Sequence, residues 1–323
     1  MRVSSSFNTI TAPILYRTVT VRDGTTSPYD LTCGSAVAAR LSPDTAANIE
    51  LIKNVIITSH PTRGAYDGLM ERMLTVDSLR LRPSDLTFGG RCSECPGKIL
   101  KRGPPEQCRY VRMFRPKKLV VFSARINSSL LELGFKTIQT VVFVLSSTRN
   151  PHEWTPNPSV PLGIKRVVEI FWTESPTEIC GYIPPGTSGV MRPFGRHLKD
   201  YVKNFSIGLY SLLKHHLQLQ EIVVVNGGHI HYAALDLPED QTREDKEEKL
   251  KAMVNKTLSE QAGVTLEYQP GRLSATYEHQ AVKRTISIKY ISLQEYLNTY
   301  DWSEEFTKTE VKAWLEDDGI MRS

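Results

Sequence analysis

The densest group of potential metal ligands in the chain is a run of three cysteines. Cys92 and Cys95 are separated by two residues, and Cys108 follows thirteen residues later. A C-x-x-C pair is half of a structural zinc site, but zinc requires four ligands in a tetrahedron and this segment contains no histidine. The fourth ligand would have to be distant, such as His60 or Cys33. We therefore expect free thiols in a loop rich in glycine and proline, and no metal.

Two histidines follow the apolar run 222–225. Asn226 and two glycines lead into His229, and His231 lies two residues beyond it, so on a strand both imidazoles would share one face. With Glu169 from an earlier strand, these residues could form a ligand site at the carboxyl ends of an α/β sheet. The chain contains no G-x-G-x-x-G, P-loop or G-x-S-x-G spacing. We therefore predict no catalytic residue and no cofactor, and keep such an α/β enzyme as the alternative.

Positive charge concentrates in one segment. Residues 80–118 contain eleven Lys or Arg and three Asp or Glu, whereas the whole chain has a net charge of +5, so the remainder is acidic. Tyr110 and Phe114 alternate with the cations, a pattern that can bind nucleic acid. We expect instead a solvated loop or one that docks on an acidic protein surface. Its candidate partner-binding residues are Arg109, Arg112, Arg115, Lys117 and Lys118.

Short β-rich segments recur in a common pattern: an apolar residue, two others, an apolar residue, one other and an apolar residue. This alternation places one side of each strand on a core. Segments this short become stable only when neighbours bury one another's apolar side. Full copies begin at Ile52, Val76, Ile138 and Leu219, a partial copy containing Glu169 begins at Ile164, and further β-rich runs span 15–21 and 118–122.

Helices are predicted between and after these strands. Apolar residues from 194 to 217 recur at steps of three and four, which predicts a long amphipathic helix before the last strand. Residues 239–262 form a highly charged helix that ends before Gly263. Thr307 or Thr309 is placed to cap a final helix.

Together these elements predict an α/β fold, an irregular leucine-rich-repeat-like solenoid of short, mostly parallel strands alternating with helices. Leucine-rich repeats recur every ~20 to 29 residues, and only some intervals here fit, so an ordinary α/β sheet is the alternative. Residues 1–22 would hold the first strand, and residues 23–323 one irregular repeat domain. Surface insertions are expected at 83–117, 147–162 and 181–195.

The composition is that of a globular protein with a sizeable core. Of the 323 residues, 40% are hydrophobic and 23% charged, which argues against wholesale disorder. The odd number of cysteines, five, does not suggest a secreted disulfide framework. Apolar stretches are of strand length, and no secretory signal follows Met1. We expect no membrane span and an intracellular protein, cytoplasmic or nuclear.

The opening of the chain resembles a junction in fungal F-box proteins. There the last F-box helix leads into a phrase like P-x-L-Y-R-x-V, which starts the first strand of a leucine-rich-repeat-like domain. The matching residues here are Pro13, Leu15, Tyr16, Arg17 and Val19. Similar segments of uncharacterised fungal proteins of this group match 117–122, 141–145, 167–172 and the tail around Trp314 and Leu315, so the resemblance touches most of the chain.

This resemblance implies a non-enzymatic protein-interaction module, a substrate-recognition domain related to F-box proteins. The F-box itself would lie before Phe7, where too few residues are present to form it. The adaptor Skp1 is therefore an expected partner only if an F-box lies upstream. We expect a protein partner rather than nucleic acid, and no family functional residue can be transferred to this chain.

Overall fold

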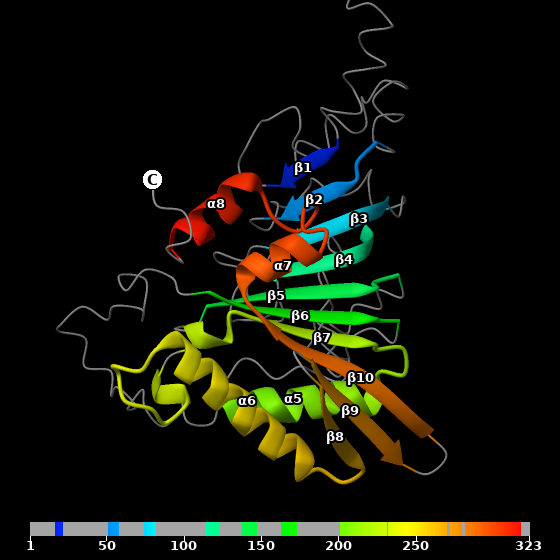
Figure 1. Ribbon diagram of the computed structural model, residues 1–323. Coiled ribbons are helices and arrows are strands. Elements are labelled where there is room, and N and C mark those ends of the chain that lie inside the picture. The colour runs from blue at the N-terminus through cyan, green and yellow to red at the C-terminus, as the bar shows by residue number, and fades with distance from the viewer. Residues whose placement is uncertain are drawn as a thin grey trace, which may run out of the picture.

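A single ten-stranded sheet organises the chain in the computed structural model (Figure 1). The structure describes residues 17–21, 51–57, 74–81, 114–122, 137–146, 163–172, 201–230, 232–269, 272–279 and 282–317. The strands are β1 (Thr18–Val21), β2 (Asn54–Ile57), β3 (Leu74–Leu81), β4 (Phe114–Phe122), β5 (Thr140–Ser146), β6 (Arg166–Trp172), β7 (Glu221–Val225), β8 (Val264–Gln269), β9 (Arg272–His279) and β10 (Val282–Ile291).

Most of the sheet is parallel, and its first seven strands lie side by side in chain order. β10 pairs with β7 in parallel, and β9 and β8 then continue the sheet in antiparallel fashion. The prediction of an α/β fold with mostly parallel strands is confirmed. All seven predicted strands are present, whereas β8, β9 and β10 were not predicted.

The recurring sequence pattern is in register across the sheet. Its middle apolar residue forms one continuous row on neighbouring strands, and its last residue forms a second row on the same side. Every member of both rows is at most 1% exposed, because each side chain is flanked by its equivalents. The middle row is Val55, Leu79, Leu119, Val141, Val167 and Ile222; the last row is Ile57, Leu81, Val121, Phe143, Glu169 and Val224.

Two helices cover this side of the sheet. α5 (Tyr201–His215) and α6 (Arg243–Ser259) share a hydrophobic core with both rows. The side chain of Thr242 caps α6 by accepting a hydrogen bond from the Asp245 backbone N–H at 3.1 Å. Gly263 follows the helix with φ +78°, where an added Cβ would lie 2.4 Å from the Glu278 carbonyl oxygen. Both helices were predicted, with longer limits of 194–217 and 239–262.

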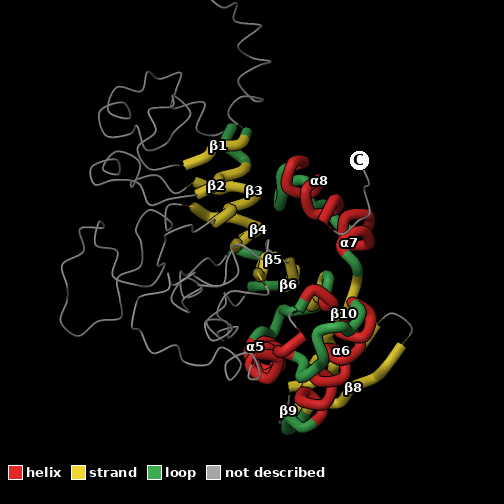
Figure 2. Tube along the Cα trace, turned by 90° about the vertical axis from the view of Figure 1, so that its left-hand side faces the viewer, coloured by secondary structure: helices red, strands yellow, loops and turns green. Residues whose placement is uncertain are grey.

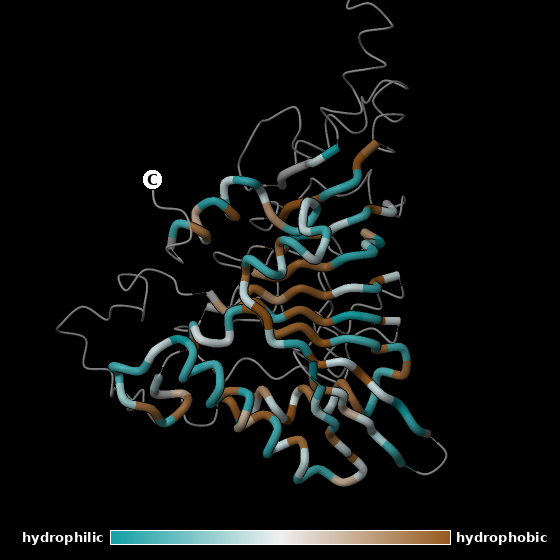
Figure 3. Tube along the Cα trace, viewed as in Figure 1, coloured by the Kyte–Doolittle hydropathy of each residue, from teal (hydrophilic) through white to brown (hydrophobic). Residues whose placement is uncertain are grey.

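The opposite side of the sheet packs against the C-terminal segment. α7 (Leu293–Thr299) and α8 (Lys308–Asp317) form a second core with the carboxyl-terminal halves of β4 to β7 (Figure 2). Apolar stretches along these strands are visible in Figure 3. Thr307 caps α8 as predicted, since its hydroxyl accepts a hydrogen bond from the Glu310 backbone N–H at 3.2 Å. α7 was not predicted.

Two short 3₁₀ helices, η4 (Gly227–His229) and η5 (Tyr232–Ala234), follow β7. β4 begins at Phe114, so the last residues of the predicted insertion 83–117 belong to a strand. The remaining residues of the three predicted insertions lie outside the described part of the chain. Within the described part, no helix combines the length and apolar character needed to cross a membrane.

Candidate functional site

A row of polar side chains crosses the sheet on the side that faces the C-terminal segment. In β2 to β7 each member lies one residue before the buried middle-row residue of its strand, so strand alternation turns it to the opposite face. Thr18, Ser287 and Ser274 join the row through the pairing of β1, β10 and β9. The row lies toward the amino ends of the parallel strands, beside the area covered by α7 and α8. Its members are Thr18, Asn54, Ser78, Lys118, Thr140, Arg166, Glu221, Ser287 and Ser274.

The first part of this row is occupied by contacts within the chain. The Ser78 hydroxyl donates a hydrogen bond to Asn54 Oδ1 at 2.8 Å. Lys118 Nζ lies 3.0 Å from Glu305 Oε1 and donates to the Asp301 carbonyl oxygen at 3.1 Å. Glu305 is buried, and burial raises its pKa although Lys118 opposes this. These contacts fix the acidic C-terminal segment on β4.

Arg80, on the neighbouring strand β3, makes similar contacts. Its Nε donates a hydrogen bond to the Glu304 carbonyl oxygen at 3.1 Å, and its Nη1 lies 3.8 Å from Glu310 Oε2. The guanidinium is almost fully buried. Two adjacent strands therefore each offer a cation to the segment that contains α8.

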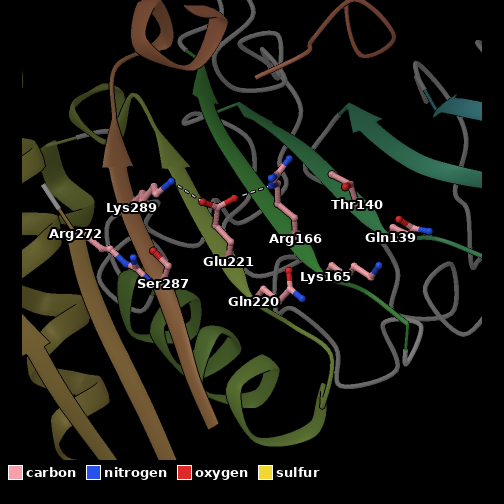
Figure 4. A pocket seen from close by; sticks show the side chains of 9 residues that line it. All are labelled: Gln139, Thr140, Lys165, Arg166, Gln220, Glu221, Arg272, Ser287 and Lys289. Atoms are coloured by element: carbon pink, nitrogen blue, oxygen red, sulfur yellow. Dashed lines mark hydrogen bonds and ion pairs between the residues drawn. The ribbon is translucent and has the colours of Figure 1, made fainter. Parts of the chain in front are cut away.

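The second part of the row lines a cavity of about 460 Å³ (Figure 4). This cavity lies where β5, β6 and β7 begin and where β10 and β9 pass beside them. All nine lining residues are polar or charged, unlike the mostly apolar lining of sites for hydrophobic ligands. They are Gln139, Thr140, Lys165, Arg166, Gln220, Glu221, Arg272, Ser287 and Lys289.

Glu221 is at the centre of the cavity wall and is shared by two cations. Its Oε2 lies 2.7 Å from Arg166 Nε, and its Oε1 lies 2.7 Å from Lys289 Nζ. Burial alone would raise the pKa of Glu221, but the hydrogen bonds from Lys289 and Arg166 outweigh burial and lower it. The hydrogen bond to Glu221 raises the pKa of Lys289. Both shifts favour the charged forms of Glu221 and Lys289.

Tyr300, just after α7, connects this cluster to the C-terminal segment. Its hydroxyl donates to Glu221 Oε1 at 3.1 Å and accepts a hydrogen bond from Lys289 Nζ at 3.2 Å. The Arg166 guanidinium lies 4.7 Å from the centre of its ring, and the Tyr296 ring stacks on it at 5.0 Å. The cluster is thereby held rigid from both the sheet and the C-terminal segment.

Two further cations line the cavity without an ion-pair partner among the described residues. Lys165 precedes β6 and Arg272 begins β9, and both are exposed. The Ser287 hydroxyl is buried and makes no hydrogen bond with the residues described. The cavity therefore combines excess positive charge with hydrogen-bonding capacity that the chain itself leaves unused, which suits an anionic, hydrophilic ligand.

The predicted partner-binding residues are only partly in this site. Lys118 belongs to the polar row, but it is engaged with Glu305. Lys117 is exposed and forms an ion pair with Asp77 at 2.8 Å, and Arg115 is exposed on β4. None of the three lines the cavity. Arg109 and Arg112 lie outside the described residues.

The residues of the alternative enzyme prediction lie at the other ends of the strands. Glu169 is fully buried, and both carboxylate oxygens lack hydrogen-bond partners among the described residues. Asn226 Oδ1 accepts a hydrogen bond from the Leu293 backbone N–H at 2.7 Å and so positions the start of α7. His229 is buried in η4. His231 lies outside the described residues, and none of the other three lines the cavity.

The potential metal ligands give no described site. Cys92, Cys95 and Cys108, with Cys33 and His60, lie outside the residues that the structure describes. Over those that it does describe, no group of three or more His, Cys, Asp or Glu is arranged to hold a metal ion.

The cavity residues were not singled out from the sequence. Arg166 and Glu221 each precede an apolar residue of the repeated pattern, which is the signal that places them on the opposite face. Arg272 and Lys289 belong to the strands that were not predicted. Only the pairing of β7 with β10 brings Glu221 and Lys289 together.

Fold and site together define an α/β protein with a mostly parallel sheet, a polar row on one face and a cationic cavity at one end of that row. Searches against protein-family models, curated proteins and solved structures found no significant match to this chain.

Proposed function

We propose that this chain is a non-enzymatic protein-interaction module that uses the polar row and its cavity as a recognition surface. In this proposal the parallel part of the sheet is an irregular leucine-rich-repeat-like solenoid, related to the substrate-recognition domains of F-box proteins. Seven parallel strands that are neighbours in chain order support this, as does the repeated pattern in register across them.

The observation that carries the proposal is that the second part of the polar row is not covered by the C-terminal segment and lines the cavity. Successive strands each contribute one side chain to the row, and Thr140, Arg166, Glu221 and Ser287 line the cavity. Such a row presents several hydrogen-bonding and charged groups at strand spacing, which suits an extended protein segment. No nucleophile–base pair was found among the lining residues, and this favours binding over catalysis.

Chemical cross-linking of the full chain in cells, followed by mass spectrometry, tests this proposal. We expect a protein partner whose cross-links end on Lys165 or Lys289, the two cavity lysines. Replacing Thr140 with Trp should fill the cavity and abolish these cross-links. The matched control is Thr265→Trp, at an exposed threonine of the edge strand β8.

Two outcomes would contradict the proposal. One is the same set of cross-linked proteins with Thr140→Trp as with the unchanged chain. The other is a partner attached only to lysines of the opposite helical side, such as Lys249 of α6. Recovery of Skp1 would support the relation to F-box proteins, and it is expected only for a product that carries an F-box upstream.

A further inference from the structure

The cavity has a marked imbalance of charge. Lys165, Arg166, Arg272 and Lys289 line it together with a single carboxylate, that of Glu221. Glu221 already contacts two of these cations at 2.7 Å each. Lys165 and Arg272 remain without an ion-pair partner among the described residues and are exposed to solvent. An anion entering the cavity would therefore meet uncompensated positive charge.

Hydrogen-bonding groups in the cavity are also unused. Ser287 is only 6% exposed, and its hydroxyl has no hydrogen-bond partner among the residues described. A buried hydroxyl without a partner costs free energy that a ligand oxygen at this point would recover. Gln139 and Gln220 add further amide donors to the lining.

The chain's own C-terminal segment shows which chemistry this face of the sheet accepts. Residues 301–317 contain six acidic and two basic residues. They pack on this face beside the cavity, where Lys118 of the polar row lies 3.0 Å from Glu305, and Arg80, two residues beyond the row member Ser78, lies 3.8 Å from Glu310. Cations of adjacent strands are thus already paired with carboxylates of a peptide chain, and the cavity continues that row.

We propose that the cavity binds carboxylate side chains in an acidic segment of the partner protein. This inference rests on the proposed function and specifies what its recognition surface selects. Nucleic acid fits less well, because among the described residues the aromatic ring in contact with the cluster is that of Tyr300, and both Tyr296 and Arg166 already contact it. A base would therefore find that ring already in use on both counts.

Fluorescence anisotropy with the full chain and labelled hexaglutamate tests the inference. Hexaglutamine serves as the uncharged peptide and a single-stranded oligonucleotide as the alternative polyanion. We expect binding of hexaglutamate that weakens with added salt, and none of hexaglutamine. The double reversal Lys165→Glu with Arg272→Glu should weaken binding about tenfold or more, since two uncompensated cations are lost.

The matched control is Lys203→Glu with Lys249→Glu, which changes the net charge equally on α5 and α6, across the sheet from the cavity. It should leave the affinity within about twofold. Equal weakening by both pairs would show unspecific attraction and overturn the inference, as would unchanged binding in the cavity variant. Tighter binding of the oligonucleotide, lost with the cavity cations, would assign the site to nucleic acid. Hexaglutamate could fail to bind while Thr140→Trp still abolishes the cross-links to a partner protein. That result would contradict this inference and leave the proposed function supported.

Discussion

Glu169 occupies a position that apolar side chains fill on the neighbouring strands. In its row it lies between Phe143 and Val224, and it is fully buried without a hydrogen-bond partner for either oxygen among the described residues. We expect Glu169→Leu to stabilise the fold by about 1–3 kcal/mol, because an unpaired polar group leaves the core. Urea unfolding should show a higher midpoint with an unchanged slope. A lower midpoint would mean that Glu169 has a partner that the row does not reveal.

The same residue should make stability depend on pH. Burial raises the pKa of Glu169 well above its ordinary value of 4.5, so the folded state holds a proton that the unfolded chain releases. Its contribution is complete below pH 4.5 and is lost as the pH rises through the folded-state pKa. We expect stability to fall with rising pH in this window, and Glu169→Gln to make the fall smaller. Glu305, whose pKa burial also raises, would account for the remainder. Identical pH profiles for the two proteins would contradict this assignment.

At the scale of elements, the C-terminal segment is held by a few charged contacts as well as by its apolar side. Lys118 is the principal ionic partner of the buried Glu305, whose carboxylate also accepts a hydrogen bond from the Tyr296 hydroxyl. Lys118→Met should leave Glu305 buried without its cation and cost about 2–4 kcal/mol. Hydrogen exchange should then increase in 292–317 more than in β4 to β7.

Lys117→Met is the matched control for this change. Lys117 is the neighbouring residue and also forms an ion pair, but it is exposed, so its loss should change stability little. The double variant Lys118→Met with Glu305→Gln should recover part of the loss, because no unpaired charge remains. Equal effects of the two single lysine changes would show that burial of Glu305 is not the cause.

The elements differ in how well the sequence predicts them. Five of the first seven strands carry full or partial copies of one apolar pattern because their neighbours are equivalent strands, and the other two, β1 and β4, are recognised as short β-rich runs. β8 and β10 also alternate, with Val264 and Leu266 in β8 and Ile286 and Ile288 in β10 on the core side, but neither contains the repeated apolar pattern. β8 is in addition the edge of the sheet and largely exposed. α7 is only seven residues long and shows too little periodicity to be recognised. The elements missed were therefore the strands that lack the repeated pattern and one short helix.

At the scale of the molecule, the cavity depends on long-range pairing. Its cations come from the start of β6 and, more than a hundred residues later in sequence, from β9 and β10. The face on which Arg166 and Glu221 lie follows from the repeated pattern. That β10 pairs with β7, although β8 and β9 come earlier in the chain, does not follow from any local signal. Hence the part of the polar row in β2 to β7 could be predicted from the sequence, whereas the cavity required the complete sheet.

The sheet is shared by two hydrophobic cores, one on each face, and this makes the C-terminal segment part of the fold. A chain that ends at Ile291 would uncover the apolar side chains that α7 and α8 bury, including Val120, Val142 and Val168. We expect it to bind a hydrophobic dye such as ANS and to aggregate more readily than the full chain. Lys118 would lose its partner Glu305 at the same time, so binding of hexaglutamate should strengthen.

A chain that ends at Asp317 keeps both helices and is the control. It should match the full chain in dye binding, in urea midpoint and in affinity for hexaglutamate. The shorter chain could bind the dye without any gain in affinity for hexaglutamate. That result would confirm that α7 and α8 cover apolar side chains of the sheet. It would contradict the argument that acidic residues of 301–317 occupy part of a peptide-binding row. Absence of dye binding would instead show that the sheet does not need α7 and α8 to cover this face.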